Sequence, residues 1–265
     1  MINWRESPWE KEWNRLVKQE NVYLKQGTAK KDSALNRLLA EKVPPKLQET
    51  LNAAFAKAFR LVFDKGTDLI EKTYKREDAE RQFKIRNYAV ELKEDRKGLR
   101  QFSRQANRTG QKNLLLSGIE GVGLGALGIG LPDIPLFVGM LLKSIYEIAL
   151  HFGYTYESPE ERYFILEMIQ TALSYGDDLN VGNQRINDFI ENGRLPAEYR
   201  QERRIEETAA VLSNELLYMK FLQGIPLLGA VGGMYDAIYL QKVQKYAKLK
   251  YHRRFLYDRK DRAKL

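Results

Sequence analysis

Three acidic residues, Glu120, Asp133 and Asp236, lie inside otherwise apolar stretches of this 265-residue sequence. A carboxylate in apolar surroundings costs free energy unless it pairs with a cation or accepts hydrogen bonds at the start of a helix. Asp133 precedes an expected helix, so a hydrogen bond donated by the backbone N–H of Leu136 to its side chain is the simplest interpretation. For Glu120 and Asp236 two interpretations stay open, an ion pair with Lys or Arg or an internal polar site. Carboxylates that meet could carry out acid–base chemistry, but no spacing in the sequence brings these three together.

Most catalytic and cofactor chemistry is excluded by the residue composition. The sequence contains no cysteine and two histidines, His151 and His252, which excludes disulfides, a cysteine nucleophile and multi-histidine metal sites. A G-x-G-x-x-G match at residues 123–128 is followed by Pro132 and Pro135, which leave no room for the helix that a dinucleotide site requires. We therefore predict no catalytic residue, no metal site and no cofactor, and the sequence favours a protein that is not an enzyme.

The apolar stretch of residues 114–142 is the feature around which we expect the chain to be organised. Its charges are Glu120 and Asp133, whereas the flanking sequence is densely charged. Pro132 and Pro135 divide the stretch, so two short helices should form a hairpin. We interpret this hairpin as the buried core of a soluble bundle, and the alternative is a hairpin that dips into or spans a bilayer.

Two Gly/Pro-rich segments, one inside this stretch and one near Pro226, carry glycine pairs at helical spacing. Gly121 and Gly125 are four residues apart, as are Gly229 and Gly233. On a helix both glycines of a pair fall on one face and allow a second backbone to approach closely. Because glycine costs about 1 kcal/mol relative to alanine inside a helix, we predict that these four residues serve close helix packing.

Helix start signals and apolar periodicity recur along the rest of the chain. The sequences S-P-W-E at 7–10 and S-P-E-E at 158–161 are capping boxes with proline at the first helical position. No run shows strand alternation, and the polar residues 177–195 are predicted as a loop around one short helix. The predicted fold class is all-α, a multi-helix bundle around the Gly/Pro-rich apolar helical hairpin. We expect helices over residues 8–26, 33–42, 46–66, 67–74, 75–108 with a break near Gly98, 134–148, 159–175, 205–219 and 226–240.

The positive charge is concentrated at the two ends of the chain. Residues 1–110 hold 25 Lys/Arg and 16 Asp/Glu, residues 111–240 hold 9 and 17, and residues 241–265 hold 10 and 2, which gives +9, −8 and +8. Two basic ends suggest an anionic surface, either nucleic acid or phospholipid headgroups, although solvated helix faces would give the same counts. Aromatic residues interleave with the cations after residue 241, and no nucleic-acid-binding motif is present. We therefore favour a membrane surface and do not expect nucleic acid as a partner.

Several of these motifs occur together, in an order and spacing that resemble the EcsC protein family, over roughly residues 40–255. The matching residues are Pro45-Lys46-Leu47, Glu120-Gly121, Leu131-Pro132-Asp133-Ile134-Pro135, Ser144-Ile145-Tyr146-Glu147-Ile148-Ala149, Gly153-Tyr154, Pro159-Glu160-Glu161-Arg162, Ile225-Pro226, Gly229 and Gly233. The resemblance implies a bacterial protein that works at or near the membrane, because the family takes its name from an operon that encodes an ABC transporter and is linked to secretion. It carries over no catalytic residue.

On this basis we expect a variable N-terminal helical extension (1–40), an EcsC-like helical domain (41–255) and a basic tail (256–265). The N-terminal sequence has no apolar signal region, so we expect a cytoplasmic protein, peripheral to or partly inserted in the inner membrane. The expected partners are an anionic membrane surface and a membrane transporter, with the oligomeric state left open. The alternatives are an enzyme with an internal site around Glu120, Asp133 and Asp236, and a basic protein that associates with nucleic acid.

Overall fold

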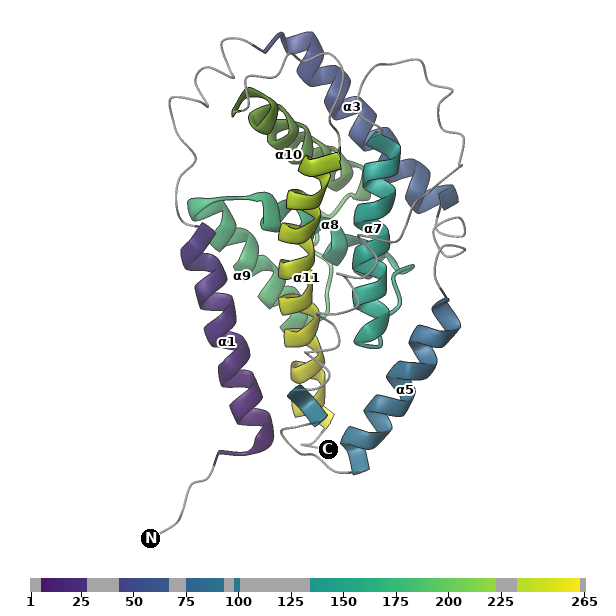
Figure 1. Ribbon diagram of the computed structural model, residues 1–265, viewed down its shortest axis with the longest axis vertical. Coiled ribbons are helices and arrows are strands. Elements are labelled where there is room, and N and C mark those ends of the chain that lie inside the picture. Colours follow the sequence, from purple (N-terminus) through teal and green to yellow (C-terminus); the bar gives the residue numbers. More distant parts are fainter. Residues whose placement is uncertain are drawn as a thin grey trace.

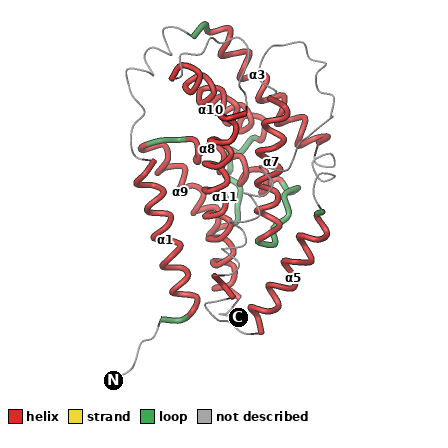
Figure 2. The backbone as a smooth tube through the Cα atoms, in the orientation of Figure 1, coloured by secondary structure: helices red, strands yellow, loops and turns green. Residues whose placement is uncertain are grey.

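The computed structural model describes residues 6–27, 43–66, 75–92, 98–100, 134–222 and 233–262. The regular structure within these ranges is helical throughout, which confirms the all-α prediction (Figures 1 and 2). The elements are α1 (Pro8–Gly27), α3 (Pro45–Leu61), the π-helical turn η1 (Val62–Gly66), α5 (Arg76–Leu92), α7 (Ile134–His151), α8 (Pro159–Leu173), α9 (Gly176–Asn192), α10 (Gln201–Leu222) and α11 (Gly233–Arg262). The predicted helices at 33–42 and 67–74 and the first half of the apolar hairpin lie outside the described residues.

Both predicted helix starts are present, the first as a complete capping box and the second with the serine cap alone. At the start of α1, the Glu10 N–H donates to the Ser7 hydroxyl at 3.1 Å, and the Ser7 N–H donates to the Glu10 carboxylate at 2.7 Å. At the start of α8, the Glu161 N–H donates to the Ser158 hydroxyl at 3.2 Å. These bonds satisfy backbone donors that a helix leaves free in its first turn, which explains why short sequence signals located both helix starts.

The predicted loop at residues 177–195 is wrong, because α9 is one continuous helix. Gly176, which we expected to close the preceding helix, begins α9, and α8 ends at Leu173. The inward positions of α9 include Leu179, Ile186 and Phe189, which recur at helical spacing between polar residues. The polar residues dominate the composition of this segment and hide that spacing.

The helices pack around α8 and α11. α8 is buried on nearly every side by α9, α10 and α11, and α11 runs through the molecule between α1, α7, α8 and α9 (Figure 1). α3 bridges α10 and α7, and α5 packs on the outer side of α7. The core contains aromatic pairs such as Tyr146 and Tyr156, whose ring centroids are 4.0 Å apart. α11 thus occupies the position of a core helix.

Among the described residues, α7 is the one helix long and apolar enough to cross a membrane by length and composition. In this fold 78% of that 18-residue stretch is buried. Burial of this kind is the pattern of a core helix in a soluble bundle, which is the interpretation favoured from the sequence.

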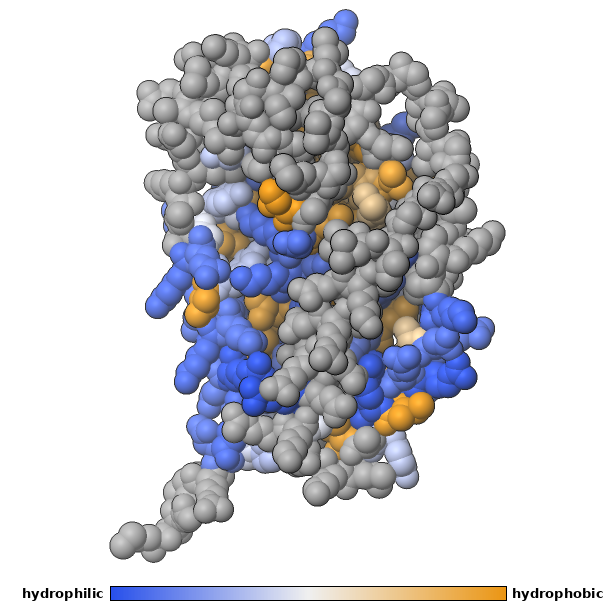
Figure 3. All heavy atoms as spheres, viewed as in Figure 1, coloured by the Kyte–Doolittle hydropathy of each residue, from blue (hydrophilic) through white to orange (hydrophobic). Residues whose placement is uncertain are grey.

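The apolar face of α1 packs on the body of the protein. Trp9 and Trp13 stack at 5.1 Å between ring centroids, and the Trp9 indole N–H donates to the Leu256 carbonyl at 2.8 Å. Figure 3 shows the outward side of α1 as largely hydrophilic. The two tryptophans therefore pack α1 against α11.

Candidate functional site

The predicted site residues fall mostly where the structure gives no side chains. Glu120, Asp133, Gly121, Gly125 and Gly229 lie outside the described residues. Gly233 and Asp236 lie in the first turn of α11, where only the backbone is described. Whether the three acids form one polar site, and whether the glycines pack together, therefore stay predictions.

The structure instead reveals a polar cluster that sequence reasoning missed, within the basic, aromatic-rich sequence that follows residue 241. Five consecutive residues of α11, from Lys250 to Arg254, are buried or largely buried. Successive residues of an α-helix are rotated by about 100°, so these five side chains point to all sides of α11. Each meets a partner on a neighbouring helix, and we call these residues with their partners the ionic layer.

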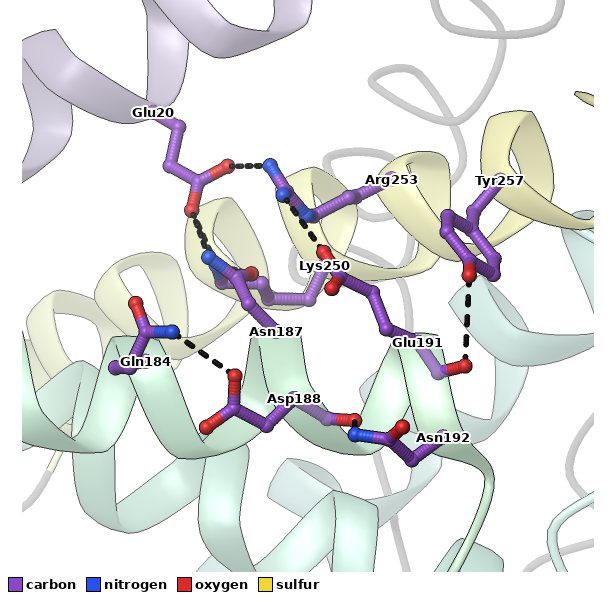
Figure 4. Close-up of polar contacts among 9 residues, drawn as sticks. All are labelled: Glu20, Gln184, Asn187, Asp188, Glu191, Asn192, Lys250, Arg253 and Tyr257. Atoms are coloured by element: carbon purple, nitrogen blue, oxygen red, sulfur yellow. Dashed lines mark hydrogen bonds and ion pairs between the residues drawn. The ribbon is translucent and has the colours of Figure 1, made fainter.

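Glu20 of α1 is the counter-charge for two cations of the ionic layer (Figure 4). Lys250 Nζ lies 2.5 Å from Glu20 Oε1, and Arg253 Nη1 lies 3.1 Å from Glu20 Oε2. Asn187 of α9 accepts a hydrogen bond from Lys250 at 2.8 Å, and Glu191 lies 3.6 Å from Arg253 Nη2. The side chain of Lys250 is 0% exposed, so this network joins α1, α9 and α11 inside the protein.

Glu161 of α8 has the same role on the neighbouring side of α11, one residue further along the helix. The Tyr251 hydroxyl donates to Glu161 Oε1 at 2.5 Å, and Arg254 Nη1 lies 2.6 Å from Glu161 Oε2. The Arg254 guanidinium also lies 4.2 Å from the centre of the Tyr154 ring, and the Tyr154 hydroxyl donates to Asp258 at 2.7 Å. Charge-assisted bonds of this length are the stronger ones in proteins, so α8 is tied to α11 at two side chains.

His252 completes the layer and faces α1 and α7. Its Nε2 is 4.0 Å from Glu12 Oε1, and its ring stacks on Phe152 with 5.7 Å between centroids. Burial, together with the nearby Arg15 and His151, lowers the pKa of His252 to about 3. The imidazole is therefore neutral at physiological pH, and it acts as a packed ring beside the charged pairs.

Burial and the neighbouring opposite charges shift the pKa values of the charged residues of the ionic layer in opposite directions. Burial lowers the pKa of Lys250 to about 8, although Glu20 favours its charged form. For Glu20, burial alone would raise the pKa, but Lys250 and Arg253 together bring it below the ordinary value. Burial raises the pKa of Glu161 despite the contact with Arg254.

A further buried carboxylate, Glu167, joins helices without α11. Glu167 of α8 is 0% exposed, and its two oxygens lie 3.0 Å from Arg185 of α9 and 3.1 Å from Arg204 of α10. Glu167 therefore lies between cations of two other helices, whereas Glu20 meets two cations of the single helix α11.

The chemistry that this arrangement can perform is limited by its burial. A lysine with a pKa near 8 could serve as a base or a nucleophile if a substrate reached it, but Lys250 Nζ is enclosed by Glu20 and Asn187. Within the part of the chain that the structure describes, no group of three or more His, Asp or Glu side chains could hold a metal ion. The geometry favours an internal clamp that sets the positions of α1, α8 and α9 on α11.

Two signals in the sequence point to this layer in retrospect. On the buried face of α1 the residues are Glu12, Leu16, Glu20 and Tyr23, so two acids share a helical face with apolar residues. In α11, Val243, Tyr246 and Ala247 recur at core spacing among the cations. A helix that is charged on all sides can still be a core helix if its neighbours supply buried acids.

These observations define a class of protein, an all-α bundle built around its own C-terminal helix and clamped there by buried ion pairs. The family model of the EcsC protein family matches residues 10–256, and this chain belongs to that family. Protein EcsC of Bacillus subtilis (strain 168) is 24% identical over 253 residues, which cover 92% of this chain and 96% of that protein. No solved structure matches the chain. The matched range includes both Glu20 and Lys250, so the two sides of the ionic layer lie inside the family domain.

Proposed function

We propose that this EcsC-family chain is a non-enzymatic accessory protein that works, peripherally, at the cytoplasmic face of the membrane. The family supports an EcsC-type protein, and the link to an ABC transporter or to secretion rests on what the family resemblance implies. The described acids and cations of the ionic layer face one another between helices, which suits a scaffold better than an active site.

The observation that carries the membrane part of this proposal is which cations are paired inside the protein and which remain for its surface. Lys250, Arg253 and Arg254 of the C-terminal basic region point inward to glutamates. Without these three cations the net charge of residues 241–265 falls from +8 to +5, so the larger part of the charge left to meet an anionic surface lies in residues 1–110, whose net charge is +9. Two of the acids in that region, Glu12 and Glu20, are buried, which leaves its surface more positive than the sequence count suggests.

A vesicle sedimentation experiment tests the proposal. The full chain is mixed at low salt with vesicles that contain phosphatidylglycerol, and in parallel with vesicles of phosphatidylcholine alone. We expect the protein to sediment with the anionic vesicles and to be released as salt is raised, because the attraction is electrostatic and is screened. A protein that stays in the supernatant with both kinds of vesicle at low salt would sink the membrane proposal.

A further inference from the structure

The inward face of α5 fixes this helix to the body of the protein. The Phe83 ring fills the space beside Gly153, where a Cβ atom would lie 2.2 Å from Phe83 Cζ. Val90 is buried, and Arg76 Nη1 lies 2.5 Å from Glu157 at the start of the helix. These contacts fall on one side of α5 and turn it against α7.

The outward face of α5 carries a stripe of cations and large apolar side chains. Arg81, Lys84, Ile85 and Tyr88 follow the i, i+3, i+4, i+7 spacing of one helical face. Ile85 is 63% exposed and Tyr88 is 62% exposed, the highest values among the exposed large apolar side chains of the described residues. Single exposed apolar residues are common on protein surfaces, but two of them one turn apart beside cations form an interfacial pattern.

Along α5, the cations are concentrated in the middle of the helix and the acids lie towards its two ends. Residues 81–88 hold Arg81, Lys84 and Arg86 and no acid, whereas the acids of α5 lie in its first turns and at Glu91. Asp78 pairs with Arg81 at the acidic end of the stripe. The sequence that follows α5, residues 93–112, holds seven Lys/Arg and two Asp/Glu.

We propose that the outer face of α5 is the surface through which this protein docks on an anionic phospholipid bilayer. Lys84 and Arg81 meet the headgroup phosphates, and Ile85 and Tyr88 enter the boundary between headgroups and acyl chains. Tyrosine suits that depth because its ring is apolar and its hydroxyl is polar. This inference rests on the proposed membrane function and names the site of contact.

The placement of charged and apolar side chains on α5 favours a lipid surface over a protein partner as the occupant. A protein groove would bury an apolar stripe with few charges at its centre, whereas here Arg81 and Lys84 lie beside the two apolar side chains on the same helical face. A bilayer accepts both at once, because the phosphates lie just above the acyl chains. Figure 3 shows the surface over α5 as mainly hydrophilic with isolated hydrophobic residues, as a shallow interfacial contact requires.

The test compares the binding of matched variants of the full chain to phosphatidylglycerol-containing vesicles. One variant carries Ile85→Ser with Tyr88→Ser, and a second carries Lys84→Glu. The apolar control is Val22→Ser with Val181→Ser, because these residues are exposed on α1 and α9. The charge control is Lys57→Glu on the exposed side of α3. Circular dichroism and thermal unfolding check that each variant keeps its fold.

We expect the α5 variants to bind the vesicles about tenfold more weakly than the wild type, a loss of about 1.4 kcal/mol of binding free energy. The affinities of the controls should stay within about twofold of the wild type. Equal binding by the wild type and the α5 variants would overturn the α5 site and leave the membrane function standing. A wild type that binds no vesicle would overturn both. Binding to native membranes that protease treatment of those membranes abolishes, without binding to pure lipid, would assign the surface to a protein partner and overturn the lipid assignment.

Discussion

At the scale of single residues, the Glu20 carboxylate allows Lys250 to remain charged inside the protein. We predict that Glu20→Gln lowers the free energy of unfolding by about 3–5 kcal/mol at pH 7, because it leaves a buried ammonium without its counter-charge. The loss should shrink as pH rises past about 8, where Lys250 can release its proton in the folded state. Denaturant unfolding at pH 7 and pH 9 measures both effects.

Two further variants show whether the effect belongs to the buried pair. Replacing both partners, Glu20→Met with Lys250→Met, should recover much of the lost stability, because the buried ammonium is removed together with its counter-charge and Arg253 keeps Glu191 at 3.6 Å. As the exposed control, Glu202→Gln removes one partner of Arg60 at the surface and should cost at most about 1 kcal/mol. A double variant as unstable as Glu20→Gln alone would contradict this account.

His252 gives the fold a second, pH-dependent contribution. Burial lowers its folded-state pKa to about 3 from an ordinary value near 6.5, so between these values the unfolded chain binds the extra proton. Stability that is fully present above pH 6.5 is therefore lost as pH falls, by about 2 kcal/mol between pH 7.5 and pH 5. The variant His252→Phe, which keeps a ring beside Phe152, should show a flatter pH dependence in denaturant unfolding. Parallel curves for the variant and the wild type would disprove the assignment.

At the scale of elements, the packing of α5 against the rest of the protein depends on a glycine. Gly153 has φ +86°, and an added Cβ would collide with the Phe83 ring. We predict that Gly153→Ala destabilises the protein by at least about 1–2 kcal/mol and raises amide hydrogen exchange in α5. Gly139, inside α7 with nothing within 4 Å of an added Cβ, is the control, and Gly139→Ala should leave stability unchanged or raise it by up to about 1 kcal/mol. Equal effects of the two substitutions would show that α5 does not depend on this contact.

The elements that the sequence predicted well are those whose signals are local. The hydrogen bonds at Ser7 and Ser158 involve residues three positions apart, so the helix starts could be predicted without any knowledge of packing. The helix α9 was missed because polar residues hide the spacing of its apolar ones. The basic part of α11 was predicted to face an anionic surface because its buried partners are distant in sequence. The positive charge of Lys250 indicates a surface until Glu20, 230 residues away in sequence, is placed beside it. The ionic layer could therefore be predicted only in outline, from acids on an apolar helical face.

At the scale of the whole molecule, α11 is the helix on which α1, α7, α8 and α9 pack, so the fold should depend on it. We predict that a chain truncated after Lys248 loses cooperative thermal unfolding, because it lacks Lys250, Tyr251 and Leu256, which are each 0% exposed. Removal of residues 263–265, beyond the end of α11 at Arg262, should leave the unfolding transition in place. A folded, cooperative protein after the longer truncation would contradict the central place of α11 in the fold.

The mode of the membrane contact proposed above depends on how the whole fold uses α7. Inserting α7 in a bilayer would remove it from its contacts with α3, α5 and α11. It would also place Lys143 and Glu147, both 7% exposed in the fold, among acyl chains. Transfer of such a charge to the bilayer centre costs about 2.5–3.5 kcal/mol. We therefore predict that high salt or alkaline carbonate releases the protein from cell membranes, while an integral membrane protein in the same sample stays in the pellet. Retention in the pellet until detergent is added would mean that α7 leaves the bundle and inserts.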